Sequence, residues 1–159
     1  MNSTSKIRVY TNGLVQNGAG AYAYIVIESE SAGEILGGHA YKPSVLRSKF
    51  SQAGPAKEEM RMKMRAVYEG VRHCPDSYEV EVYTDNFLVD TALRTTEPNQ
   101  EDGDIAERYR RYIAQHGIKP QFIICKHYNE RDLPANDHDE WTWMAYHMCE
   151  KAIEDYGTH

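Results

Sequence analysis

Residues 79–86 read EVEVYTDN, and this stretch decides how the rest of the chain is interpreted. Val80 and Val82 alternate with charged residues, which is the pattern of a half-buried β-strand. Asp85 follows the strand directly, and residues 87–93 after it predict a short helix. Asp85 therefore has two open interpretations. It is a cap at the start of that helix, or it is a functional carboxylate at the edge of a sheet.

The residues before this strand predict three further strands and one helix. The strands are expected over residues 6–10, 22–28 and 35–41, with turns over 16–20 and 29–33. Residues 42–54 are polar and are expected to be irregular. Pro55 is expected to open the helix, because proline is tolerated at a first helical position. Its apolar stripe, at helical spacing, consists of Met60, Met64, Val67 and Val71.

The residues after Asp85 predict helices at 87–93, 104–116 and 139–155, with a strand at 119–126. The last helix carries one apolar stripe, formed by Trp141, Met144, Met148 and Ala152. The order β-β-β-α-β-α-α-β-α predicts an α/β fold, a five-stranded mixed sheet flanked by helices. We expect a single domain over residues 5–156, with flexible termini at 1–4 and 157–159.

Composition restricts the class of protein. The 159 residues are 41% hydrophobic and 26% charged, which is typical of one soluble globular domain. No apolar run is long enough for a membrane span, and the N-terminus lacks a signal-peptide pattern. Three widely spaced cysteines indicate reduced thiols, so we expect a cytoplasmic protein. We also expect a monomer. The net charge of −6 is unfavourable for binding a phosphate backbone unless cations are clustered or metal ions bridge the contact.

Four positions could converge at one edge of such a sheet: Asn12, Glu59, Asp85 and Asp139, with Asp137 as the alternative to Asp139. Oxygen ligands gathered in this way suit two Mg²⁺ or Mn²⁺ ions. Each position also has a purely structural explanation. Asn12-Gly13 is a common hairpin turn, Glu59 complements a helix dipole, and the aspartates can cap helices.

In this order the motifs resemble those of type 1 ribonuclease H, over roughly residues 7–152. The resemblance rests on the first strand and turn (VYTNG, 9–13), the second strand (GAGAYAY, 18–24), Glu59 with Ala66-Val67 in the first helix, the strand end VYTDN (82–86), the later helix and strand (104–124) and DEW (139–141). Asp139 is preferred to Asp137 because Trp141 then takes the place of a core leucine. Asn12 stands where the family has its first catalytic aspartate.

The resemblance implies a ribonuclease H-like fold and an endonuclease that hydrolyses the RNA strand of RNA–DNA hybrids with two metal ions. Glu59, Asp85 and Asp139 would be catalytic metal ligands, and position 12 would hold the residue shared by both ions. His127, or less plausibly His138, would match a loop histidine that helps the product leave. Candidate phosphate contacts are Lys57, Lys63, Arg108, Arg110, Arg111, Lys119 and Lys126. We expect weak, salt-sensitive binding that is independent of sequence.

Asn12 is the main departure from this pattern, because a neutral amide replaces a bridging carboxylate. Three explanations are open: a deliberate inactivating replacement, a natural binding module that does not cleave, or an ordinary turn at Asn12-Gly13. The presence of the other three acids favours the first. A related nuclease that acts on DNA or junctions is a further alternative.

Overall fold

The structure of the chain is a computed structural model, and it describes residues 5–35, 38–41, 45–76, 78–125 and 137–157. At residues 5, 29–35, 38–41 and 137–140 only the backbone is described. The elements are β1 (Ser5–Gln16), β2 (Ala19–Ile35), β3 (Gly38–Tyr41), β4 (Val45–Pro55), α1 (Glu59–Val71), β5 (Glu79–Thr84), α2 (Leu88–Thr95), α3 (Gly103–His116), β6 (Lys119–Ile124) and α4 (Asp137–Gly157).

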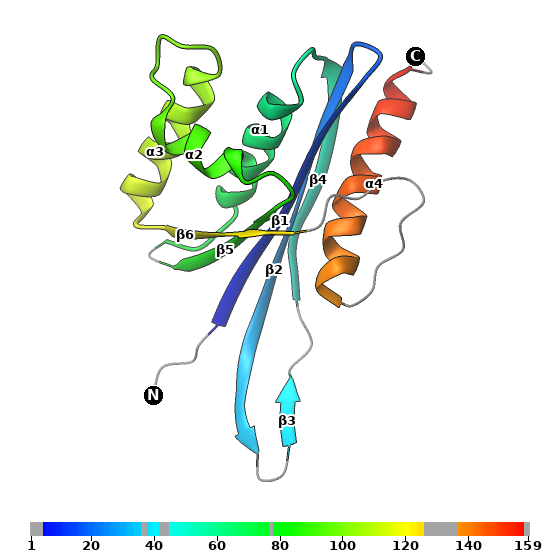
Figure 1. The fold of residues 1–159 in the computed structure, drawn as a ribbon. Coiled ribbons are helices and arrows are strands. Elements are labelled where there is room, and N and C mark those ends of the chain that lie inside the picture. The colour runs from blue at the N-terminus through cyan, green and yellow to red at the C-terminus, as the bar shows by residue number, and fades with distance from the viewer. Residues whose placement is uncertain (1–4, 36–37, 42–44, 77, 126–136, 158–159) are drawn as a thin grey trace.

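The strands form a mixed sheet with helices on both faces (Figure 1). Five strands pair in the order β4-β2-β1-β5-β6, and β3 makes a further short pairing with β2. β2 runs antiparallel to β1 and β4, whereas β1, β5 and β6 are mutually parallel. The expected five-stranded mixed sheet is therefore confirmed.

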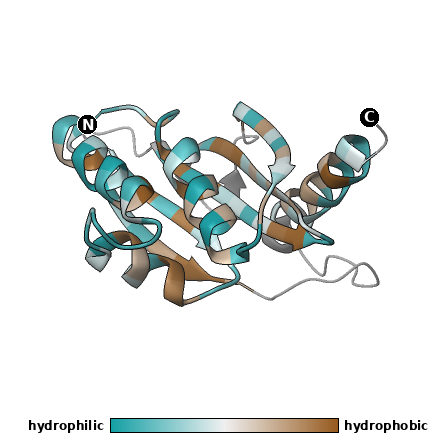
Figure 2. Cartoon of the chain, turned by 90° about the horizontal axis from the view of Figure 1, so that it is seen from above, coloured by the Kyte–Doolittle hydropathy of each residue, from teal (hydrophilic) through white to brown (hydrophobic). Residues whose placement is uncertain are grey.

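The core consists of two apolar layers, one on each face of the sheet. Alternate residues of β1 serve the two layers: Ile7 and Val9 pack toward α1, and Tyr10 packs toward α4. In Figure 1, α1, α2 and α3 lie on one face and α4 covers the other. The helices alternate between hydrophilic and hydrophobic segments, and the strands between them carry hydrophobic stretches (Figure 2). The predicted apolar stripes of α1 and α4 are confirmed as the packed faces.

The first hairpin turns within the expected residues 16–20, but its first strand is longer than expected. Its turn lies at Asn17-Gly18, where both residues have positive φ (52° and 80°), whereas Asn12 and Gly13 continue β1 and pair with β2. The interpretation of Asn12-Gly13 as a turn is therefore wrong. A second expected turn, at residues 29–33, is also wrong, because β2 continues to Ile35. Polar residues in these strands resembled turn residues.

The segment at residues 42–54 was expected to be irregular, but most of it forms β4, and Pro55 ends that strand instead of opening a helix. β4 lies at the edge of the sheet beside β2, so much of it is solvent-exposed and tolerates polar residues. A proline at the end of an edge strand leaves no ladder hydrogen bond unmade. The expected helix instead begins at Glu59.

The remaining helices agree with expectation to within a few residues. α3 ends at His116, and Gly117 follows it with φ of 64°, the left-handed conformation that glycine adopts at little cost. α4 is the longest helix at 21 residues. Across the described ranges, none of the helices combines the length and apolar character needed to cross a bilayer.

Candidate functional site

The parallel pairing of β1 with β5 brings Asn12 and Asp85 together. Tyr10 pairs with Tyr83, and the two rings stack with centroids 4.5 Å apart. Thr11 Oγ1 donates a hydrogen bond to the Tyr83 carbonyl at 2.7 Å, which holds the strands together at this end. Asn12 and Asp85 each come two residues after the paired tyrosines, so their side chains emerge on the same side of the sheet.

Asn12 is buried, with 4% of the residue exposed. Its side-chain Oδ1 accepts hydrogen bonds from the Gly13 backbone N–H at 2.8 Å and from Lys63 Nζ at 2.9 Å. Cys149 of α4 contacts the other side of the residue, where its Sγ donates to the Asn12 carbonyl at 3.5 Å. Burial raises the pKa of the Cys149 thiol to about 12, so this sulfur stays protonated and neutral at physiological pH.

α1 supplies both Glu59 and Lys63, which lie four residues apart and therefore on the same face of the helix. The helix approaches β1 closely at Gly13. A Cβ on Gly13 would lie 2.4 Å from the Lys63 backbone nitrogen, so only glycine permits this contact. Glu59 remains at the rim, with 41% of its side chain exposed.

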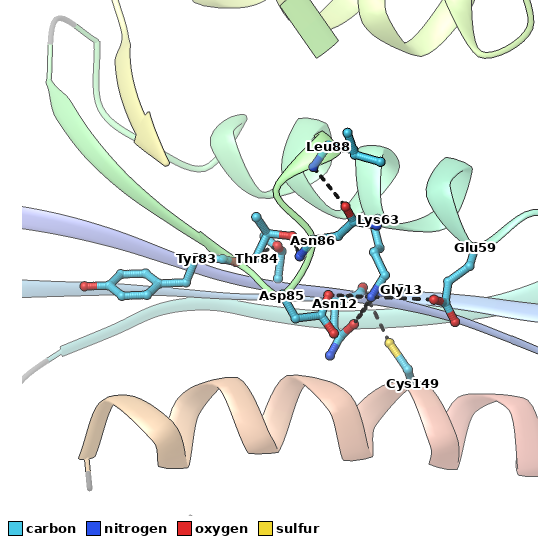
Figure 3. Close-up of polar contacts among 11 residues, drawn as sticks. Asn12, Gly13, Glu59, Lys63, Tyr83, Thr84, Asp85, Asn86, Leu88 and Cys149 are labelled. Carbon is cyan, nitrogen blue, oxygen red and sulfur yellow. Dashed lines mark hydrogen bonds and ion pairs between the residues drawn. The ribbon is translucent and has the colours of Figure 1, made fainter. Parts of the chain in front are cut away.

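Lys63 lies at the centre of the cluster (Figure 3). Its Nζ donates to Asp85 Oδ1 at 2.6 Å and to Asn12 Oδ1 at 2.9 Å, and it lies 4.0 Å from Glu59 Oε2. The side chains of Lys63 and Asp85 are only 2% and 3% exposed. The structure thus places three of the four predicted site residues around one buried ammonium group.

Sequence reasoning missed this role of Lys63, which was expected to be a surface phosphate contact. That interpretation is wrong, because the side chain is buried and already paired. Two signals in the sequence pointed to it. Lys63 lies one helical turn after Glu59, and it is flanked by Met62 and Met64, both of which are buried.

A pair of divalent metal ions would have to share the oxygens of this cluster with Lys63. Mg²⁺ binds oxygen ligands at about 2.0–2.1 Å, so in this cluster it would have to contact the same oxygens that Lys63 contacts. Here the facing oxygens of Asn12 and Asp85 already accept from Lys63, whose positive charge would repel a dication in contact with them. Within the described residues no group of three or more His, Cys, Asp or Glu side chains could hold a metal ion. The described side chains therefore do not fit the metal pair while Lys63 is in place.

The fourth predicted ligand cannot be placed in the same way. α4 begins at Asp137, but the side chains of residues 137–140, including Asp139 and His138, lie outside the described part, as does His127. Trp141 packs against the core layer on the α4 face, with its ring centroid 6.3 Å from that of Tyr10. This agrees with the core role expected of Trp141.

Asp85 does not cap α2, contrary to its structural alternative. Its neighbour Asn86 provides this contact, since Asn86 Oδ1 accepts from the Leu88 backbone N–H at 2.9 Å. Asp85 is directed to Lys63 instead. Asp85 therefore belongs to the site cluster, whereas the start of α2 is contacted by Asn86, a residue to which sequence reasoning gave no role.

We expect Asn86→Ala to lower the free energy of unfolding by about 1 kcal/mol, the usual cost of losing a side-chain cap. Urea denaturation followed by circular dichroism would measure the change. Asn86→Ser, which retains an acceptor, should recover most of the loss. An Asn86→Ala variant as stable as the parent chain would show that the contact does not support α2.

The other predicted phosphate contacts divide into paired and unpaired groups. Arg110 donates to the carbonyls of Leu93 and Thr96, both at 2.8 Å, and so ties α3 to α2. Arg111 pairs with Glu107 on the same helix. Lys126 lies outside the described residues. Lys57, Arg108 and Lys119 are exposed and make no such side-chain contact with the described part of the chain.

Comparison with solved structures identifies the fold. The N-terminal ribonuclease H domain of Rv2228c from Mycobacterium tuberculosis superimposes with a TM-score of 0.62 at 12% identity, covering 98% of each chain. LC11-RNase H1 in complex with an RNA/DNA hybrid gives 0.61 at 13% identity, covering 95% of this chain and 99% of the other. A foamy viral protease-reverse transcriptase in complex with dsDNA gives 0.56 at 9% identity, covering 95% and 94%.

No protein-family model and no curated protein sequence matches the chain. The structural likeness alone is sufficient for the architecture: the chain has a ribonuclease H-like fold. At sequence identities this low, the structural similarity establishes the fold and does not establish the activity.

Proposed function

We propose that this chain is a ribonuclease H-like domain that binds RNA–DNA hybrid. We propose further that it does not cleave the hybrid by metal-ion catalysis. The observation that carries the proposal is the position of Lys63 Nζ, which lies among Asn12, Glu59 and Asp85. Two-metal hydrolysis needs those oxygens for its ions. One neighbour of the same fold is complexed with an RNA/DNA hybrid and another with dsDNA, so hybrid is the ligand proposed here and duplex DNA is its competitor in the test.

Charge sets the expected strength of binding. The chain carries a net charge of −6, so contact with a phosphate backbone depends on a few local cations. Lys57 is an exposed cation that lies two residues before Glu59, just before the start of α1. Lys119 begins β6, at the opposite end of the parallel strands from Asp85. The two lysines form a matched pair for testing where the ligand lies.

Fluorescence anisotropy of a labelled RNA–DNA hybrid at low salt tests this proposal. We expect binding that weakens as salt rises and that is equal in Mg²⁺ and in EDTA. We also expect Lys57→Glu to weaken binding more than Lys119→Glu does. Absence of binding at low salt, or binding that requires Mg²⁺, would contradict the proposal. A duplex DNA of the same length serves as the competitor that establishes hybrid preference.

The second candidate is a hybrid endonuclease, as the resemblance implies. Glu59 and Asp85 both lie in the cluster, as that activity requires. For such an enzyme Lys63 would have to leave the cluster when metal and substrate bind. Loss of intact RNA strand in Mg²⁺ or Mn²⁺, absent in EDTA, would favour this candidate over a binding module.

A further inference from the structure

We infer that Lys63 is a resident cation: its ammonium group takes the electrostatic place of metal ions in this fold, and Asn12 is the matching change that closes the site around it. The inference concerns the cluster itself and holds whether or not the domain binds nucleic acid. It follows because the described side chains of the cluster do not fit a pair of metal ions. The closed cluster then has a structural role that needs no added ion.

The hydrogen bonds of the ammonium group support this assignment. An ammonium has three N–H donors, and three side-chain oxygens lie within 4.0 Å of Lys63 Nζ. Asp85 Oδ1 and Asn12 Oδ1 are within hydrogen-bond distance, at 2.6 and 2.9 Å, and Glu59 Oε2 lies further out at 4.0 Å. A buried lysine of this kind is stable only when it is paired in this way.

The charges of the cluster explain why Asn12 and Lys63 belong together. Among the described side chains Glu59 and Asp85 are acids, Lys63 is a cation and Asn12 is neutral. An aspartate at position 12 would contact the same ammonium, so its charge would be neutralised by Lys63 before any metal ion arrived. An acid at position 12 alone therefore does not open the site, whereas removing the ammonium as well takes away the cation that faces both oxygens, so that a hard cation can approach them.

The backbone around Gly13 shows how the lysine reaches this position. Because Gly13 has no side chain, α1 lies against β1, and Lys63 extends past Gly13 toward Asn12 and Asp85 (Figure 3). The ammonium group thus reaches Asn12 and Asp85 because α1 lies close to β1 and the long Lys63 side chain is directed inward.

Calorimetric titration with Mn²⁺ tests the inference on four folded proteins: the unaltered chain, Asn12→Asp, Lys63→Ala, and the double variant. We expect saturable Mn²⁺ binding and a raised unfolding midpoint only in the double variant, with the two changes strongly non-additive. Mn²⁺ binding by the unaltered chain, or equal binding by Asn12→Asp alone and by the double variant, would overturn the inference. So would a folded double variant that does not bind Mn²⁺.

A measurement on the unaltered chain keeps the inference testable if the variants do not fold. Acetylation with an amine-reactive reagent, read by peptide mass mapping, reports which lysines are accessible. We expect Lys63 to react more than about tenfold more slowly than Lys57, because only an opened state exposes it. This protection should be the same with and without Mn²⁺. Exposure of Lys63 upon addition of Mn²⁺ would show that the metal displaces the ammonium, and would overturn the inference.

Discussion

Lys63→Met is expected to lower the free energy of unfolding by about 3–5 kcal/mol, the usual cost of breaking one half of a buried ion pair. Methionine keeps most of the length of the side chain and removes its charge. Asp85, whose side chain is 3% exposed, would then be left as a buried carboxylate without the ammonium that faces it at 2.6 Å. Urea denaturation of the variant and the parent chain measures this difference.

Two control variants sharpen this prediction. Lys57→Met removes an exposed lysine near the start of the same helix and should change stability by no more than about 0.5 kcal/mol. Adding Asp85→Asn to Lys63→Met removes the buried charge that Lys63 faced and should recover part of the loss. A loss below about 1 kcal/mol for Lys63→Met would instead be typical of a solvent-exposed pair, and would contradict the buried arrangement.

Gly13→Ala is expected to destabilise the fold by about 1–3 kcal/mol or more, because a well-packed interior has no room for an added methyl group. The new Cβ would lie 2.4 Å from the Lys63 backbone nitrogen and 2.5 Å from the Met62 carbonyl carbon. These are backbone atoms and cannot rotate away, so α1 must shift away from β1. The shift would also move Lys63 relative to Asn12, so acetylation of Lys63 should rise with the loss of stability.

Gly54→Ala is the matched control for this change. Gly54 also lies in a strand, but nothing lies within 4 Å of the Cβ that alanine would add. Its stability should stay within about 0.5 kcal/mol of the parent chain. If both variants are equally stable, the close contact between β1 and α1 is not a determinant of the fold.

The sequence was sufficient to predict the fold class, because long periodic segments indicate their own structure. The apolar stripes of α1 and α4 and the alternation in β5 predicted those elements to within a few residues. β4 was missed because an edge strand is partly solvated and so lacks a clear apolar pattern. The first strand of the β1–β2 hairpin was predicted too short for a related reason. Asn12-Gly13 has the composition of a turn, yet both residues pair with β2 in the ladder.

The candidate site was predictable in its positions but not in its chemistry. Asn12, Glu59 and Asp85 converge as the ordered motifs indicated, because strand pairing and helix packing fix where those positions lie. The role of Lys63 depends on where one flexible side chain ends, and that follows from the Gly13 contact between α1 and β1. Sequence spacing could place Lys63 on the same helix face as Glu59, but it could not show that the ammonium turns inward.

Lys63 also changes how Asn12 is interpreted. A deliberate inactivating replacement would leave the rest of a metal site ready for use, whereas here a buried ammonium already contacts both Asn12 and Asp85. The contacts therefore support the second explanation, a natural module that does not cleave. A neutral residue at position 12 and a cation at position 63 are then parts of one arrangement.

Cleavage of a labelled RNA–DNA hybrid in Mg²⁺ or Mn²⁺ by the Asn12→Asp variant tests this account most directly. We predict that Asn12→Asp, like the unaltered chain, leaves the RNA strand intact, because Lys63 still occupies the oxygens that metal ions would need. Metal-dependent cutting of the RNA strand by Asn12→Asp alone would contradict the account, and would show instead a ribonuclease H inactivated at a single position.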